Sequence, residues 1–235
     1  MSFISPGPER SHARPKRRGG RPQALAEIPD RFPSPGSEAP RSKPRALRRA
    51  GPYLALLLLA AAATAEPLPV PLDLQYQLLT KIMSFDRNFK RRITNEVVIG
   101  VLYQRSSPES RAVMAEWVSV VHRSSAPSFE GLPPRTVPIE WTDEKSLDAA
   151  LDRESINILY VTPLNDTPIA AIVSLCRARR ITTVSGVPDY VTKGVALGFD
   201  LKADKVEILI NLKSARAEGA NFRSSLLRLV RVLED

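Results

Sequence analysis

Apolar residues follow two periods along the chain from residue 66 onward, one typical of helices and one typical of strands. Four apolar residues recur at helical spacing and predict a first amphipathic helix: Leu78, Ile82, Phe85 and Phe89. Residues 96–102 form a short, β-branched and almost entirely apolar run, as expected for a strand with both faces buried. Ser107 and Pro108 then suit the cap and the first turn of a second helix.

The alternation of strand and helix continues as far as residue 186. Residues 136–141 predict an edge strand, because Pro138 has no N–H to donate to a central ladder. A third helix is expected from about Asp143. Two further apolar runs predict inner strands, at residues 156–161 and 181–186. Cys176 lies on the apolar stripe of the helix between these two strands, so we expect it in the core.

The last part of the chain does not continue the alternation of strand and helix. Residues 195–201 and 206–210 each alternate between apolar and other side chains across a short connection, which predicts an antiparallel hairpin. Helical spacing predicts a closing helix from the apolar residues Leu226, Leu229, Val230 and Leu233. The predicted fold class is therefore α/β, with helices on both faces of a largely parallel mixed sheet that ends in an antiparallel hairpin and a C-terminal helix.

The residues before 66 differ from the rest in composition. Residues 1–47 are rich in Pro, Gly, Ser and Arg and have almost no apolar periodicity, which predicts a disordered basic segment. Residues 48–65 have the three-part plan of a secretory signal peptide, with Arg48 and Arg49, an apolar Leu/Ala run and small residues at the end. The folded domain is then expected over residues 66–235, exported from the cytoplasm after the signal is cleaved.

The position of this signal within the chain is unusual. A signal peptide is normally about 15–30 residues long and starts at the N-terminus. Translation that begins near Leu47 would give a signal of that length, so we hypothesise a misassigned start. The alternatives are a genuine basic tail or an organelle transit peptide for residues 1–47, and an uncleaved anchor for residues 48–65. The apolar run is shorter than the roughly 20 residues of a comfortable membrane span, which favours a cleaved signal over an anchor. Membrane contact is expected only through this segment, and only if it is left uncleaved.

The net charge of +9 is concentrated in the same N-terminal part. Through Ala65 there are 12 Lys and Arg against 4 Asp and Glu, a net charge of +8, which leaves 22 against 21 and a net charge of +1 for the rest. A nearly neutral domain lacks the basic surface that binding to a phosphate backbone requires. We therefore expect no nucleic-acid partner.

Residue types that could support catalysis are few after residue 65. His122 falls at the end of the second predicted helix, where an imidazole complements the helix dipole, and Cys176 falls on a buried stripe. The single cysteine of the chain excludes an internal disulfide and a multi-cysteine zinc site. No Gly-rich phosphate-binding string follows a predicted strand. We expect no enzyme, no cofactor and no metal, and a hydrolase would have to depend on His122.

Several strings near the C-terminal end resemble one family. These strings are residues 183–190 (TVSGVPDY), 194–200 (GVALGFD), 210–219 (INLKSARAEG) and 222–229 (FRSSLLRL). In their order and composition they resemble the YfiR family. The resemblance implies a periplasmic α/β regulator that binds the sensory domain of a membrane-bound diguanylate cyclase and holds it inactive. In other members a different signalling protein, such as a sensor kinase, replaces the cyclase.

The resemblance also implies a homodimer. Better-studied relatives carry several cysteines and respond to redox state, whereas this chain has only Cys176, so release controlled by a disulfide is not carried over. The function expected from the sequence is therefore an exported regulatory binding protein. The alternative is a periplasmic small-ligand receptor, with its site in the loops after Leu102, Val161 and Ser185, because parallel sheets bind ligands at the carboxyl ends of their strands.

Five residues are candidates for contact with a partner: Arg87, Phe89, Asn211, Arg223 and Arg228. An exposed Phe89 beside Arg87 could anchor a partner, although a cationic end of the first helix is the simpler explanation. Asn211 ends the hairpin and could equally cap the following helix. Arg223 and Arg228 are expected on the outer side of the closing helix.

Overall fold

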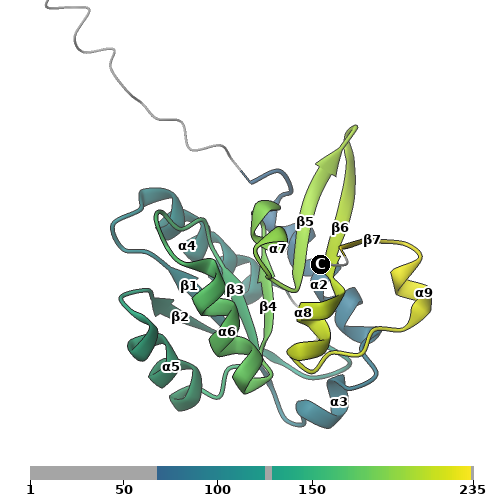
Figure 1. Cartoon of the computed structure of the whole chain (residues 1–235), viewed down its shortest axis with the longest axis horizontal. Coiled ribbons are helices and arrows are strands. Elements are labelled where there is room, and N and C mark those ends of the chain that lie inside the picture. Colours follow the sequence, from purple (N-terminus) through teal and green to yellow (C-terminus); the bar gives the residue numbers. More distant parts are fainter. Residues whose placement is uncertain (1–67, 125–128, 234–235) are drawn as a thin grey trace, which may run out of the picture. The chain divides into compact units, whose positions relative to one another are not determined.

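A seven-stranded sheet forms the centre of the region that this computed structural model describes, residues 68–124 and 129–233 (Figure 1). The order across the sheet is β2-β1-β3-β4-β5-β6-β7. The strands are β1 (Val97–Tyr103), β2 (Pro134–Glu140), β3 (Ile158–Val161), β4 (Thr182–Ser185), β5 (Leu197–Lys202), β6 (Lys205–Asn211) and β7 (Arg231–Leu233). Neighbouring strands are parallel except β5 and β6, which form the antiparallel hairpin. The predicted mixed, largely parallel α/β sheet is confirmed.

Eight helices accompany this sheet within the described residues. They are α2 (Leu72–Ser84), α3 (Phe89–Arg92), α4 (Pro108–Arg123), α5 (Glu144–Arg153), α6 (Ile169–Arg179), α7 (Asp189–Thr192), α8 (Leu212–Ala217) and α9 (Ser224–Leu227). Successive side chains of a strand point to opposite faces, so β1 serves two cores. Ile99 and Val101 join one apolar cluster with α2 and α4, whereas Val98 and Leu102 join a second with α5 and α6. Helices therefore cover both faces, as predicted (Figure 1).

The first core is organised around an aromatic contact on the central strand β3. The Trp117 ring of α4 stacks on the Tyr160 ring, with 3.9 Å between their centroids. The hydroxyl of Tyr160 donates a hydrogen bond of 2.9 Å to Oε1 of Gln75, and Nε2 of Gln75 donates one of 2.7 Å to the carbonyl of Val70. All of these side chains are buried. These contacts fix α2 and α4 to the interior strand β3 of the sheet.

Predicted helix starts and core positions agree with the structure. Ser107 accepts a hydrogen bond from the backbone of Ser110 at 3.2 Å, and Asp143 accepts one from Ser146 at 2.8 Å, so both residues cap their helices. β2, which contains two prolines, lies at the edge of the sheet. Cys176 is fully buried in the second core.

Two predicted elements have different bounds in the structure. The first helix ends at Ser84, and Phe89 begins the separate helix α3, because the buried carboxylate of Asp86 accepts hydrogen bonds from the backbone N–H groups of Asn88 and Asn221 and turns the chain. The closing helix ends at Leu227, so its predicted extension to Leu233 is wrong. The chain instead adds β7 parallel to β6, whose edge would otherwise lack hydrogen-bond partners.

The N-terminal predictions lie outside the described residues. Both the basic segment over residues 1–47 and the signal peptide over residues 48–65 belong to this part of the chain. Among the helices that the structure describes, none is long and apolar enough to cross a membrane.

Candidate functional site

The structure brings two of the five predicted contact residues together. The backbone N–H of Arg87 donates to the carbonyl of Asn221 at 3.0 Å, and that of Arg223 donates to the carbonyl of Phe85 at 3.1 Å. These bonds, with the isolated bridge between Asp86 and Phe222, pair two segments that are far apart in the sequence. Arg87 and Arg223 are both exposed and lie on the same part of the surface.

Phe89 is not available as the exposed anchor that we expected. Its side chain is 1% exposed and stacks with Phe129 at 6.2 Å between ring centroids. It is the first residue of α3, and the turn at Asp86 directs its ring into the first core. The prediction of an exposed Phe89 is therefore wrong, because it depended on a first helix that continued through this residue.

Asn211 has the structural role that we weighed against partner contact. Its Oδ1 accepts a hydrogen bond of 2.9 Å from the backbone of Ser214, which caps α8, and its Nδ2 donates to the carbonyl of Val191 at 3.3 Å. The side chain is 4% exposed, so both ends of the amide are used inside the domain. This residue fixes the end of the hairpin against α7 and α8.

Arg228 lies on a different surface, which we call the hairpin surface. It contains the three exposed large apolar residues of the described chain, Leu201 (44% exposed), Val206 (36%) and Leu229 (78%). A shallow hollow beside β6 is lined by residues that include Lys202, Lys205, Val206, Arg228, Leu229 and Arg231. Leu201 and Val206 continue the alternating apolar pattern of the hairpin beyond the core. This continuation is the feature of the sequence that could have indicated an exposed apolar surface.

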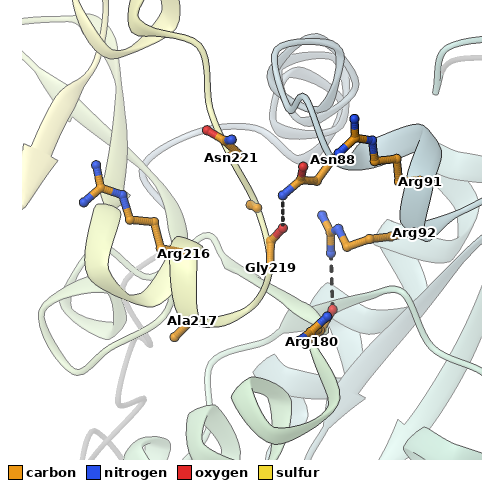
Figure 2. A pocket seen from close by; sticks show the side chains of 9 residues that line it. Asn88, Arg91, Arg92, Arg180, Arg216, Ala217, Gly219 and Asn221 are labelled. Atoms are coloured by element: carbon orange, nitrogen blue, oxygen red, sulfur yellow. Dashed lines mark hydrogen bonds between the residues drawn. The ribbon is translucent and has the colours of Figure 1, made fainter.

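A second hollow, which we call the arginine hollow, has a volume of about 690 Å³. Its lining includes Arg91, Arg92, Arg180 and Arg216, with Asn88 and Asn221 (Figure 2). Arg91 and Arg92 are neighbours in the sequence, in α3. Arg180 and Arg216 come from the end of α6 and from α8, and no local pattern in the sequence connects them.

Hydrogen bonds hold one wall of the arginine hollow in place. Nη2 of Arg92 lies 2.7 Å from Oδ2 of the buried Asp86, and Nη1 of the same guanidinium donates to the carbonyl of Arg180 at 3.2 Å. Nδ2 of Asn88 donates to the carbonyl of Gly219 at 3.0 Å (Figure 2). These bonds join α3 to the turn after α6 and to the loop after α8.

A buried carboxyl group lies behind this wall. Glu218 accepts hydrogen bonds from the backbone N–H of Thr183 at 2.8 Å and from its hydroxyl at 2.7 Å. Burial raises the pKa of Glu218 to about 8, although the bonds from Thr183 and the charges of Arg177 and Arg92 oppose this rise. The group therefore carries little charge at neutral pH.

Groups that could support catalysis are placed separately. His122 is exposed in the last turn of α4, at the place predicted for it. Burial raises the pKa of the Cys176 thiol well above its usual range, which disfavours the thiolate. Among the described residues, no three His, Cys, Asp or Glu side chains form a cluster that could hold a metal ion.

The loops at the carboxyl ends of the strands make bonds to their own neighbours. In the loop after β3, the backbone N–H of Leu164 donates to the Tyr190 hydroxyl at 2.9 Å, and this hydroxyl donates to the carbonyl of Leu164 at 3.1 Å. The backbone N–H of Asn165 donates to Oε1 of Gln104 at 2.8 Å. Side chains of the domain thus use backbone groups that a ligand in these loops would need, which weakens the receptor alternative at this edge.

A comparison of the sequence with models of protein families finds one match. The family model described as YfiR/HmsC-like matches residues 76–231, more than half of the chain. The chain belongs to the YfiR/HmsC-like family. This is a regulatory family, and membership is consistent with a regulator of a diguanylate cyclase.

The strings that carried the resemblance have clear positions in this YfiR/HmsC-like fold. Asn211 caps α8, Ala215 is buried in the first core, and Gly219 adopts a positive φ of 89° where the chain leaves α8. A Cβ atom at residue 219 would meet Cδ of Arg92 at 3.4 Å and Cβ of Arg180 at 3.5 Å. The spacing of Asn211, Ala215 and Gly219 thus follows from the structure, in which they form a helix cap, a packed helix face and the turn after the helix.

One solved structure shares the fold at low sequence identity, and a second shows a weaker similarity. A conserved domain protein from Vibrio cholerae O1 biovar El Tor matches with a TM-score of 0.52 at 12% identity, covering 70% of this chain and 60% of that one. A ligand-free, open substrate-binding protein with adhesive properties from Clostridium difficile has a TM-score of 0.49 at 16% identity, with the same coverage. The chain thus spans about 60% of the length of these proteins. No curated protein matches this chain.

Proposed function

We propose that this protein is an exported regulatory binding protein that represses a membrane-bound diguanylate cyclase, or a related signalling enzyme such as a sensor kinase, through its periplasmic sensory domain. The match to the YfiR/HmsC-like family over residues 76–231 carries the proposal. In this account the protein acts by stoichiometric binding. Its own chemistry is limited to the surface that it offers to the partner.

The hairpin surface is the contact surface that the structure favours. Leu229 is 78% exposed, and Leu201 and Val206 add further exposed apolar area. Lys202, Lys205 and Arg228 line the hollow together with Val206 and Leu229, and its one carboxylate, that of Glu207, pairs with Arg231 at 3.5 Å. Apolar side chains within a charged rim are the usual composition of a protein interface. A partner surface with an apolar centre and acidic rim would fit.

Arg87 and Arg223 form a second candidate contact. Both are exposed, and the paired segments 85–87 and 221–223 fix their backbones side by side. Arginine is enriched at positions that contribute strongly to binding. We assign them a supporting role, since Phe89 is buried and supplies no apolar anchor.

Export places the domain where this partner is accessible. The proposal includes cleavage of the signal over residues 48–65 and release of the domain into the periplasm. The homodimer that the family resemblance implies is also part of it. Mass spectrometry of the exported protein should find an N-terminus near Glu66 and no peptides from residues 1–46.

A pull-down from detergent-solubilised membranes tests the proposed function. With the purified protein as bait, mass spectrometry should recover a diguanylate cyclase or a sensor kinase. Leu229→Asp should abolish recovery, because it places a charge at the centre of the hairpin surface. Ala115→Asp adds the same charge at an exposed position of α4 and should leave recovery unchanged. Recovery of no membrane signalling protein by the unmodified bait would contradict the proposal.

A further inference from the structure

Positive charge collects around the arginine hollow without a matching carboxylate. Arg91, Arg180 and Arg216 are exposed, and within the described part of the chain their guanidinium groups make no hydrogen bond or ion pair. Several other surface arginines face carboxylates, as in the pairs Arg105–Glu140, Arg135–Glu96, Arg179–Asp148 and Arg231–Glu207. Within the described residues, the exposed Arg87, Arg223 and Arg228 form no such pair, but they do not share one hollow. The arginine hollow is distinguished by the four guanidinium groups that line a single hollow.

The nearest acidic groups do not neutralise these three arginines. The carboxylate of Asp86 is fully buried and lies 2.7 Å from Arg92, which is a fourth guanidinium. Glu218 is buried behind the wall, where its pKa is raised to about 8, so it adds little negative charge at neutral pH. Three positive charges thus remain available to a molecule in the hollow.

The three arginines come from three separate segments. Arg91 belongs to α3, Arg180 ends α6 in a left-handed conformation with φ of 57°, and Arg216 belongs to α8. Figure 2 shows Arg91 and Arg216 on opposite sides of Gly219, with Arg180 below them. The bonds of Arg92 and Asn88 join these segments, so the backbone positions from which the three arginines extend are fixed relative to one another.

We propose that the arginine hollow binds a small soluble molecule that carries two or more anionic oxygen groups, of the class of phosphorylated metabolites. Guanidinium groups bind phosphate and carboxylate oxygens in bidentate fashion, and separated guanidinium groups suit a ligand with more than one anionic group. The volume of about 690 Å³ is ordinary for a small-molecule site. This site is independent of the hairpin surface and of the proposed partner.

Its location also differs from the one that the fold alone would suggest. Arg180 lies just before β4, at the amino end of the parallel strands. Ligands in open α/β sheets usually bind at the opposite, carboxyl edge. Here the carboxyl-edge loops are tied to Tyr190 and Gln104, whereas the amino edge carries the unpaired charges.

Isothermal titration calorimetry with inorganic pyrophosphate tests the proposal on the purified protein. We expect saturable binding that weakens as salt is added. The variant Arg91→Ala/Arg216→Ala should bind at least about tenfold more weakly, since each guanidinium contributes charge-assisted hydrogen bonds. Arg153→Ala removes one exposed charge in α5, outside both the hollow and the hairpin surface, and should bind as the unmodified protein does. Circular dichroism should show that all variants remain folded.

Two results would overturn the proposal. One is the absence of saturable heat with pyrophosphate, and the other is an affinity that the double variant does not change. Phosphate groups also occur in lipid headgroups, so flotation with phosphatidylcholine vesicles that contain phosphatidylglycerol forms a second arm. Flotation without binding of pyrophosphate would assign the arginines to a membrane surface and reject the soluble ligand.

Discussion

The ring of Trp117 lies over the ring of Tyr160, with 3.9 Å between centroids and 21° between planes. This contact joins α4 to the central strand β3, and both side chains are fully buried. Trp117→Ala should lower the free energy of unfolding by about 3–5 kcal/mol, because it leaves a large cavity. Urea unfolding followed by circular dichroism measures this loss.

A milder substitution at the same position separates packing from hydrogen bonding. Nε1 of Trp117 is buried and has no hydrogen-bond partner within the described structure. Trp117→Phe keeps an aromatic ring and removes this unpaired donor, so it should cost clearly less than the alanine variant. Equal losses for the two variants would show that the ring does not pack on Tyr160 as described.

Glu218 predicts a dependence of stability on pH. Burial raises its pKa from 4.5 to about 8, so the unfolded chain releases this proton at lower pH than the folded domain does. The stabilisation from the neutral group is complete below about pH 4.5. It declines as the pH rises, and is lost once the pH exceeds about 8.

The variant Glu218→Gln tests this assignment. It cannot ionise, so its stability should change less between pH 5 and 8 than that of the unmodified protein. Urea unfolding at several pH values measures the difference. Asp148, whose pKa is lowered by the hydrogen bond from Arg179, contributes in the acidic range instead, where stability falls as the carboxylate gains its proton. Parallel pH profiles for the two proteins would contradict a buried neutral Glu218.

A side chain at Gly198 in β5 should clash with a neighbouring residue, and a smaller neighbour should relieve the clash. A Cβ atom at this position would clash with Cγ2 of Val191 in α7. Gly198→Ala should therefore destabilise the domain by roughly 1–3 kcal/mol. Val191→Ala in the same chain should recover part of this loss, as thermal unfolding can measure. A double variant with purely additive losses would show that the two residues are not in contact.

Asn211, which belongs to a string shared with the family, should contribute measurably to the stability of the domain. Asn211→Ala removes the cap of α8 and leaves the carbonyl of Val191 without this donor, and should cost about 1–2 kcal/mol. Lys213→Ala, two residues later in α8, is a matched control and should have little effect. Urea unfolding distinguishes them. If Asn211→Ala were neutral for stability but lost partner binding, the residue would be a contact residue.

Local patterns were sufficient for most of the fold. The apolar run of β1 and the alternation of the hairpin predict strands because burial on one or both faces leaves a period in the sequence. Ser107 and Asp143 predict helix starts because a cap acts within three residues. Cys176 follows from the apolar stripe of its helix.

Long-range contacts explain what the sequence did not reveal. Asp86 bonds to Asn221, 135 residues away, and this contact ends the first helix and buries Phe89. Leu226 to Leu233 have helical spacing, yet the open edge of β6 selects a strand for the last three described residues. The arginine hollow is assembled from three segments in the same way. No local pattern could have placed Arg216 beside Arg180.

The most direct test of the central claim is the activity of a diguanylate cyclase recovered with this protein. In membrane vesicles oriented to expose its sensory domain, synthesis of cyclic di-GMP would be measured as purified protein is added. The account predicts that synthesis falls and levels off near one protein per cyclase, and that Leu229→Asp leaves it unchanged. Synthesis that is unaffected by a saturating excess of the unmodified protein would contradict the account.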